Sequence, residues 1–146
     1  MNYQELTEEL CDLHFRYAPA VNKLDSFRFF RGEDGALIWL YKRNASACAS
    51  DLVEAFGLTP GRVANIVRKL EQQSYITRAQ DCSDQRRSHI YLTPSGAETA
   101  KRKYSEMLSC FQSILDQLCE EDAAAYVHIF GLLMRSASTP DSPGKE

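Results

Sequence analysis

The stretch DLVEAFGLTPGRVANIVRKL, residues 51–70, decides the fold of this chain. Its first part predicts a short helix that is capped by Ser50 and ended by Gly57, because glycine readily adopts the left-handed conformation that terminates a helix. Thr59 is a second predicted N-cap, and Pro60 follows at the first helical position, where its missing N–H costs nothing. The second helix has one apolar stripe at helical spacing, formed by Val63, Ile66, Val67 and Leu70. Two helices joined by a tight turn that contains glycine form a helix-turn-helix.

The periodicity changes from helical to alternating after these two helices. Residues 75–78 and 88–93 favour β-structure, and the second run places Ile90 and Leu92 on one face. The segment between the runs is polar and predicts a loop. A β-hairpin that follows a helix-turn-helix is a wing, so this part of the chain predicts a winged helix-turn-helix.

Helical patterns also flank the winged domain on both sides. They predict helices over residues 5–18, 33–43, 94–118 and 121–136, with a further helical piece through Val21, Leu24 and Phe27. We therefore expect a mainly α-helical fold with a small β-hairpin wing. The expected divisions are residues 1–30 (N-terminal dimerisation region), 31–94 (winged helix-turn-helix), 95–137 (C-terminal dimerisation helices) and 138–146 (disordered tail). The flanking apolar stripes exceed what a winged domain of roughly 60 residues needs for its own core, which predicts a dimer.

Charge is distributed unevenly along the chain. Residues 62–103 carry nine basic and four acidic side chains, whereas the whole chain has a net charge of −3. This asymmetry indicates a surface for a polyanion, although chance clustering on a solvated face would look the same. A winged helix used only for protein contacts, with the basic hairpin on an acidic partner, is a further alternative.

Several function classes lack their sequence signals. The chain has no apolar segment long enough to span a membrane and no secretory leader, and its five cysteines form no CxxC pair, so we expect a reducing cytoplasm. A phosphate-binding glycine loop, HExxH and GxSxG are missing, and the three histidines fall in different predicted elements. We therefore expect neither an enzyme nor a cofactor nor a metal site.

The segment DQRRSHIYLTPSG, residues 84–96, fits the pattern D-x-R-x₅-L-T-x-x-G. It resembles the wing signature of the MarR (multiple antibiotic resistance regulator) family of transcription factors, and residues 58–71 and 75–78 are similar to that family's recognition helix and the strand after it. The resemblance covers about residues 32–100. It implies a homodimeric repressor that binds a pseudo-palindromic operator in double-stranded DNA and is released by a small-molecule effector. It also implies that Arg86 enters the minor groove while Asp84 holds the wing loop in shape.

The polar face of the second helix of the helix-turn-helix supplies the expected DNA contacts. Arg62 suits guanine and Asn65 suits adenine, whereas Arg68 and Lys69 are better placed for phosphates. The free backbone N–H groups that follow Thr59 can also face the DNA. The complete expected set is Thr59, Gly61, Arg62, Asn65, Arg68, Lys69, Arg78, Asp84, Arg86 and Arg87.

Candidate sensing residues fall outside this set. Candidates to line an effector pocket are His14, Phe27, Phe29, Phe30, Trp39 and Tyr41, although aromatic residues at helical spacing more often form core.

Cys11 resembles the position of the reactive cysteine in the hydroperoxide-sensing branch of the family, and Cys82 in the wing is a second redox candidate. These thiols leave a redox-sensing regulator of the same fold as an alternative, but Asp12 disfavours a thiolate at Cys11. Cys11 and His14 have the spacing of two metal ligands, which is fewer than the four that a structural site needs.

Overall fold

The computed structural model describes residues 2–19, 32–81 and 84–138, except for the side chains of residues 80–88 and 138. The helices are α1 (Tyr3–Arg16), α3 (Gly32–Lys42), α4 (Ala49–Phe56), α5 (Pro60–Gln72), α6 (Pro94–Leu115) and α7 (Glu120–Ser138), and the strands are β1 (Ser46–Cys48), β2 (Ile76–Asp81) and β3 (Asp84–Leu92). The predicted fold class, mainly helical with a small winged sheet, is confirmed. The expected helical piece at residues 21–27 and the expected tail after residue 138 lie outside the described residues.

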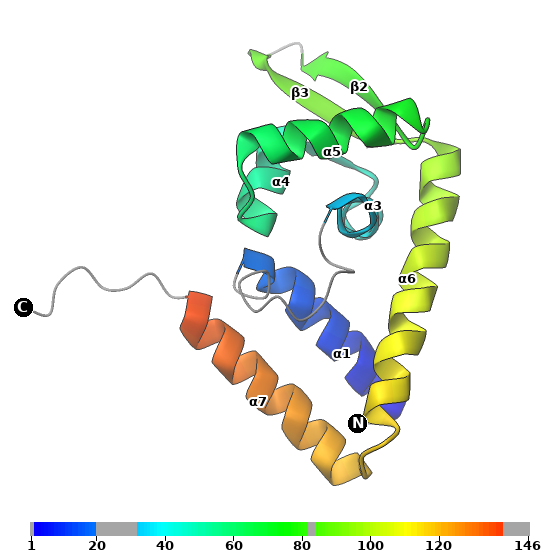
Figure 1. Ribbon diagram of the computed structural model, residues 1–146, viewed down its shortest axis with the longest axis vertical. Helices are drawn as coiled ribbons and strands as arrows, with labels where there is room; N and C mark the ends of the chain where they lie inside the picture. The colour runs from blue at the N-terminus through cyan, green and yellow to red at the C-terminus, as the bar shows by residue number, and fades with distance from the viewer. Residues whose placement is uncertain (1, 20–31, 82–83, 139–146) are drawn as a thin grey trace, which may run out of the picture.

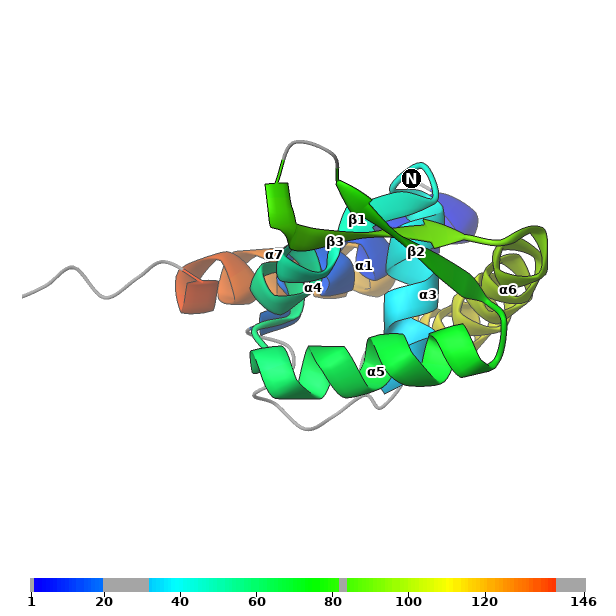
Figure 2. The same cartoon turned by 90° about the horizontal axis from the view of Figure 1, so that it is seen from above.

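The long helix α6 connects two parts of the molecule. Figure 1 shows α3, α4, α5 and the sheet at one end, with α1 and α7 at the other end. In Figure 2, which looks onto the winged end, α5 lies along one side and the sheet along the other. Among the described residues, no helix is both long and apolar enough to cross a membrane.

Two helix starts follow the capping signals in the sequence. Thr59 Oγ1 accepts a hydrogen bond from the N–H of Arg62 at 3.2 Å, and Thr93 Oγ1 accepts one from the N–H of Gly96 at 3.0 Å. Each cap is followed by a proline at the start of the helix. Gly57 has a φ of 63°, the left-handed conformation expected at the end of α4. These local signals fix both ends of the turn that precedes α5.

Other predicted boundaries were wrong. The first helix is shifted by two residues, to 3–16, because Asn2 and Glu5 form a capping box. Helix α4 begins at Ala49 with Cys48 as its N-cap, not Ser50, and Asp51 Oδ2 accepts the N–H of Cys48 at 3.0 Å. α6 ends at Leu115, three residues before the predicted end.

The sheet is larger than the predicted hairpin. It has three antiparallel strands in the order β1-β3-β2, with Ser46 paired to Tyr91 and Cys48 to His89. β1 has only three residues, too few to show an alternating pattern. The predicted loop is also partly strand, because β2 continues to Asp81 and β3 begins at Asp84. This segment of the sequence is polar throughout, so no alternation of polar and apolar residues marked it as a strand.

The core consists of two main clusters. One joins α3, α4, α5 and the sheet, and includes Leu52, Leu70 and Ile90. The other lies between α1, α6 and α7, and it includes Ile38 from α3. Ile38 is 1% exposed, so the apolar face of α3 packs against both parts of the molecule. Two ion pairs cross the same boundary: Lys42 of α3 contacts Asp12 of α1, and Asp34 of α3 lies 3.2 Å from Lys103 of α6.

Candidate nucleic-acid interface

α5 has one buried and one exposed face, as the sequence predicts. The stripe Val63, Ile66, Val67 and Leu70 is at most 8% exposed. Gly61, Arg62, Asn65, Arg68 and Lys69 are all exposed. A Cβ atom added to Gly61 would have no atom within 4 Å, so packing within this chain does not require glycine there. The exposed face of α5 is therefore free for close approach by an external partner.

Two predicted contacts on this face touch each other. The guanidinium of Arg68 donates a hydrogen bond to Oδ1 of Asn65, one turn earlier. An asparagine that reads adenine must accept a hydrogen bond through this same oxygen. Arg68 and Asn65 are therefore coupled, and a base bound by Asn65 would either share this oxygen with Arg68 or displace it, because an amide oxygen can accept two hydrogen bonds.

An open groove separates the exposed face of α5 from the start of α3. Its volume is about 510 Å³, and it is lined by Gly32, Glu33, Asp34, Arg62, Asn65, Ile66 and Lys69. Lys69 Nζ lies 3.5 Å from Glu33 Oε1 across this groove. The predicted phosphate contact thus already has an acidic neighbour.

The wing lies at the same end of the molecule as α5 (Figure 1). Arg78 pairs in register with Ile90, and its Nε lies 3.3 Å from Glu71 Oε2 at the end of α5. Asp84, Arg86 and Arg87 belong to β3, but their side chains lie outside the described part of the structure. The fold therefore places the predicted α5 and wing residues on neighbouring elements.

Comparisons with known proteins agree with this geometry. The family model described as "MarR family" matches residues 35–88. A relative with 21% identity over 137 residues, covering 91% of this chain and 99% of its own length, is the uncharacterized HTH-type transcriptional regulator YwhA of Bacillus subtilis.

Residues 35–88 of the chain match the MarR family. The resemblance inferred from residues 58–71 and 84–96 is confirmed, and this family and the relative are transcriptional regulators rather than enzymes.

Solved structures show the same fold. The chain is similar to S. aureus MepR in a DNA complex, with 25% identity, a TM-score of 0.65 and coverage of 93% of this chain and 98% of that one. It is also similar to Streptococcus pneumoniae FabT in complex with DNA, with 22% identity, a TM-score of 0.63 and coverage of 92% of this chain and 96% of that one. A third similar structure is a MarR transcriptional regulator from Methanosarcina mazei Go1, with 18% identity, a TM-score of 0.65 and coverage of 87% of this chain and 89% of that one.

The acidic partners of α5, Glu33 and Glu71, are the part of this surface that the sequence pattern did not reveal. Glu71 is local to α5, and its spacing from Arg78 offered a weak signal. Glu33 comes from a different helix, 36 positions before Lys69 in the sequence. Such a contact depends on how α3 crosses α5, which no local pattern reveals.

Of the predicted effector-pocket residues that the structure describes, His14 lies apart from Trp39 and Tyr41. His14 is fully buried, and its ring packs against Phe130 and Phe111 with centroid distances of 4.4 and 4.8 Å. Trp39 packs against Phe56 in the other core cluster, and Tyr41 is partly buried against that cluster. Phe27, Phe29 and Phe30 lie outside the described residues. The structure therefore gives no support to one pocket lined by both His14 and Trp39.

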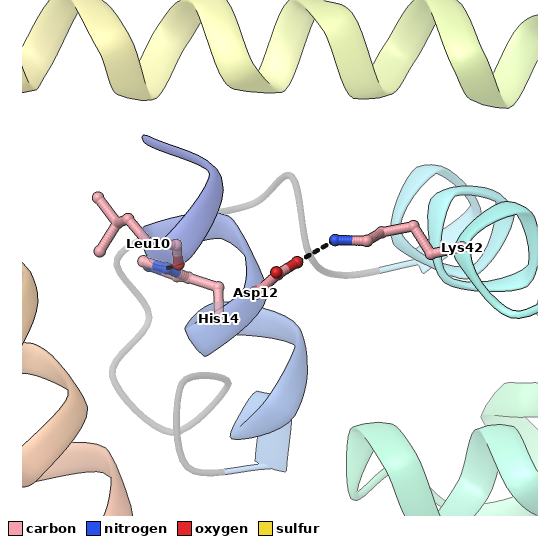
Figure 3. Close-up of polar contacts among 4 residues, drawn as sticks. All are labelled: Leu10, Asp12, His14 and Lys42. Carbon is pink, nitrogen blue, oxygen red and sulfur yellow. Dashed lines mark hydrogen bonds and ion pairs between the residues drawn. The ribbon is translucent and has the colours of Figure 1, made fainter. Parts of the chain in front are cut away.

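The environment of His14 is that of a core histidine. Its Nδ1 lies 2.7 Å from the carbonyl oxygen of Leu10, so Nδ1 carries the proton that is donated (Figure 3). Burial lowers the pKa of His14 below 6.5, more strongly than the backbone hydrogen bond raises it. A neutral, donating imidazole accounts for the position without a ligand.

The neighbourhood of Cys11 does not favour a thiolate. Cys11 is fully buried, and burial raises its pKa to about 12 despite the nearby charge of Lys42. Lys42 is itself paired with Asp12, as Figure 3 shows. Cys82 lies outside the described residues, and within them no group of three His, Cys, Asp or Glu side chains could hold a metal ion.

Proposed function

We propose that this protein is a homodimeric repressor that binds double-stranded DNA with α5 and the wing. The exposed face of α5 carries the proposal, because Arg62, Asn65 and Lys69 line one side of a helix whose opposite side is buried. The N-terminal end of this helix suits base contacts in the major groove, and the positions further along it suit phosphates. MepR and FabT, which are similar in fold, were both solved with DNA, and this supports the proposal.

The exposed apolar residues support a dimer. The large hydrophobic side chains that are at least 38% exposed, among the described residues, are Tyr91, Ile114, Tyr126, Ile129, Leu132 and Leu133. All but Tyr91 lie on α6 and α7, where a groove of about 360 Å³ also runs between α1 and α7. A second copy of the chain would cover this apolar surface. A two-fold dimer would present its two α5 helices about 34 Å apart, one turn of DNA, to a pseudo-palindrome.

Release by a small-molecule effector is the regulatory part of the proposal. The pairs Asp12–Lys42 and Asp34–Lys103 connect α1 and α6 to α3, while Glu33 at the start of α3 contacts Lys69 of α5. A ligand that binds one arrangement of these helices better than another would shift α3 relative to the DNA-reading face. The expected compartment for such a regulator is the cytoplasm.

The salt dependence of DNA binding tests the proposal. An operator is first selected from a random DNA pool, and its affinity for the full chain is measured over a range of salt concentrations. The logarithm of the affinity should fall linearly with the logarithm of the salt concentration, with a slope that reports the number of phosphate contacts. Failure to enrich any DNA sequence, or an affinity that salt leaves unchanged, would favour the protein-contact alternative.

A further inference from the structure

The outer face of the sheet brings a thiol and an imidazole together. Cys48 on β1 and His89 on β3 are directly paired, so their side chains lie on the same face. Cys48 Sγ lies 3.6 Å from His89 Nδ1, within hydrogen-bond reach for sulfur. The ring of Tyr91, two residues further along β3, lies 4.7 Å from the His89 ring between centroids.

This pair is accessible to solvent. The neighbouring residues Ala47 and Ile90 point to the opposite face and are 5% and 0% exposed. Cys48 and His89 are partly exposed, and Tyr91 is 43% exposed. A small planar molecule could therefore reach the sulfur beside the two rings.

The backbone adds a second feature at the same sulfur. Cys48 is the N-cap of α4, a helix of eight residues, and the N-terminal end of a helix favours negative charge. Asp51 accepts the N–H of Cys48, and its negative carboxylate opposes this effect of the helix on the thiol. The imidazole beside the sulfur is therefore the feature that gives Cys48 the surroundings of a nucleophilic cysteine.

We propose that Cys48 is a covalent modification site for small α,β-unsaturated carbonyl compounds, with His89 as its general base. A metal site fits less well, because within the described residues no third His, Cys, Asp or Glu completes a ligand set. The site lies where the wing sheet meets the helix-turn-helix. The proposal stands on the Cys48–His89 geometry and does not rest on DNA binding.

The reaction is an addition that needs no oxidant. His89 Nδ1 accepts the proton of the Cys48 thiol, and the thiolate sulfur attacks the β-carbon of the ligand. The S–C bond forms as the π electrons of the C=C bond move toward the α-carbon and the carbonyl oxygen. The proton on Nδ1 then passes to the α-carbon, so that S–H has been added across C=C and the imidazole is restored. This role requires neutral His89 to carry its other proton on Nε2.

The test follows N-ethylmaleimide addition to the full chain, with the rate at each cysteine resolved by peptide mass spectrometry. Cys119 is exposed and serves as the unassisted reference in the same chain, and buried Cys11 reports any unfolding. At neutral pH we expect Cys48 to react roughly tenfold to a hundredfold faster than Cys119, although Cys48 is less exposed. His89→Gln should remove most of this excess at Cys48 and leave the Cys119 rate unchanged.

Two outcomes would overturn the proposal. One is a Cys48 rate in the unmodified protein at or below that of Cys119, which needs no variant to interpret. The other is a His89→Gln chain with Cys11 still protected and the Cys48 rate unchanged. The dependence on pH adds a readout that mere exposure would not change. The Cys119 rate should rise more steeply with pH than the Cys48 rate, because His89 takes the proton from Cys48.

Discussion

Lys69 Nζ on α5 lies 3.5 Å from Oε1 of Glu33 on α3, so the proposed phosphate contact of α5 is paired with an acidic side chain. The Lys69 side chain is 65% exposed and that of Glu33 is 34% exposed. An ion pair at such a surface stabilises the fold by roughly 1 kcal/mol or less. If α5 binds DNA as proposed, a phosphate should displace Glu33 at small cost, and we expect Glu33 to lower the affinity for DNA of any sequence.

Removing the charge of Glu33 should strengthen DNA binding. Glu33→Gln is expected to raise the affinity a few-fold for operator and random DNA alike, because it frees Lys69 and removes repulsion from phosphates. Fluorescence anisotropy at fixed salt measures both affinities. Glu106→Gln, an exposed site on α6, makes the same charge change away from α5. An equal effect of the two substitutions would show that only the net charge matters.

Base reading and phosphate binding should separate along α5. Lys69→Ala should weaken all sequences similarly and reduce the magnitude of the salt slope by about one. Asn65→Ala should cost about 1–3 kcal/mol, mainly at one base position in each half-site. Binding to a panel of single-base operator variants at two salt concentrations distinguishes these effects. If Asn65→Ala lost affinity evenly across the panel, Asn65 would be a positioning contact and not a reader of bases.

The wing arginine should matter for DNA binding more than for stability. Arg86→Ala is expected to weaken operator binding by about 1–3 kcal/mol, because one charged contact in the minor groove is lost. The thermal unfolding midpoint should remain close to that of the unmodified protein. Unchanged affinity in a chain with unchanged circular dichroism would remove Arg86 from the interface.

The dimer should depend on α7. Light scattering at micromolar concentration should report about twice the chain mass of 16.6 kDa, and Leu133→Glu should shift this toward one chain mass. Leu133 is 59% exposed within one chain, so a charge there should hardly change the free energy of unfolding of the single chain. Tyr91→Glu, also at an exposed apolar residue but on the sheet, is the matched control. A Leu133→Glu protein that stays dimeric would place the interface elsewhere.

The sequence predicted those features that depend on local chemistry. Thr59 and Thr93 are caps in the structure because each signal needs only the next few residues. The stripe from Val63 to Leu70 is buried for a similar reason, since its spacing already defines one face of a helix. The strand β1 and the Glu33–Lys69 pair escaped prediction, because each needs a partner that is distant in the sequence. The helical periodicity predicted that Asn65 and Lys69 lie on the exposed face of α5, but it could not predict which side chains they contact.

Burial of His14 should make the fold sensitive to mild acid. Burial lowers the pKa of His14 in the folded protein below 6.5, the value expected in an unfolded chain, so below about pH 7 the unfolded state binds more protons. The free energy of unfolding should therefore decrease as the pH falls through 6.5 toward the folded-state pKa, because protonation places a charge between Phe111 and Phe130.

Urea unfolding at pH 7.5 and 5.5 measures the loss in a range where most carboxylates stay ionised. His14→Gln should lower stability at both pH values but reduce the difference between them. If His14→Gln retained the full difference, the acid sensitivity would come from other groups, and the imidazole of His14 would be a packing element alone.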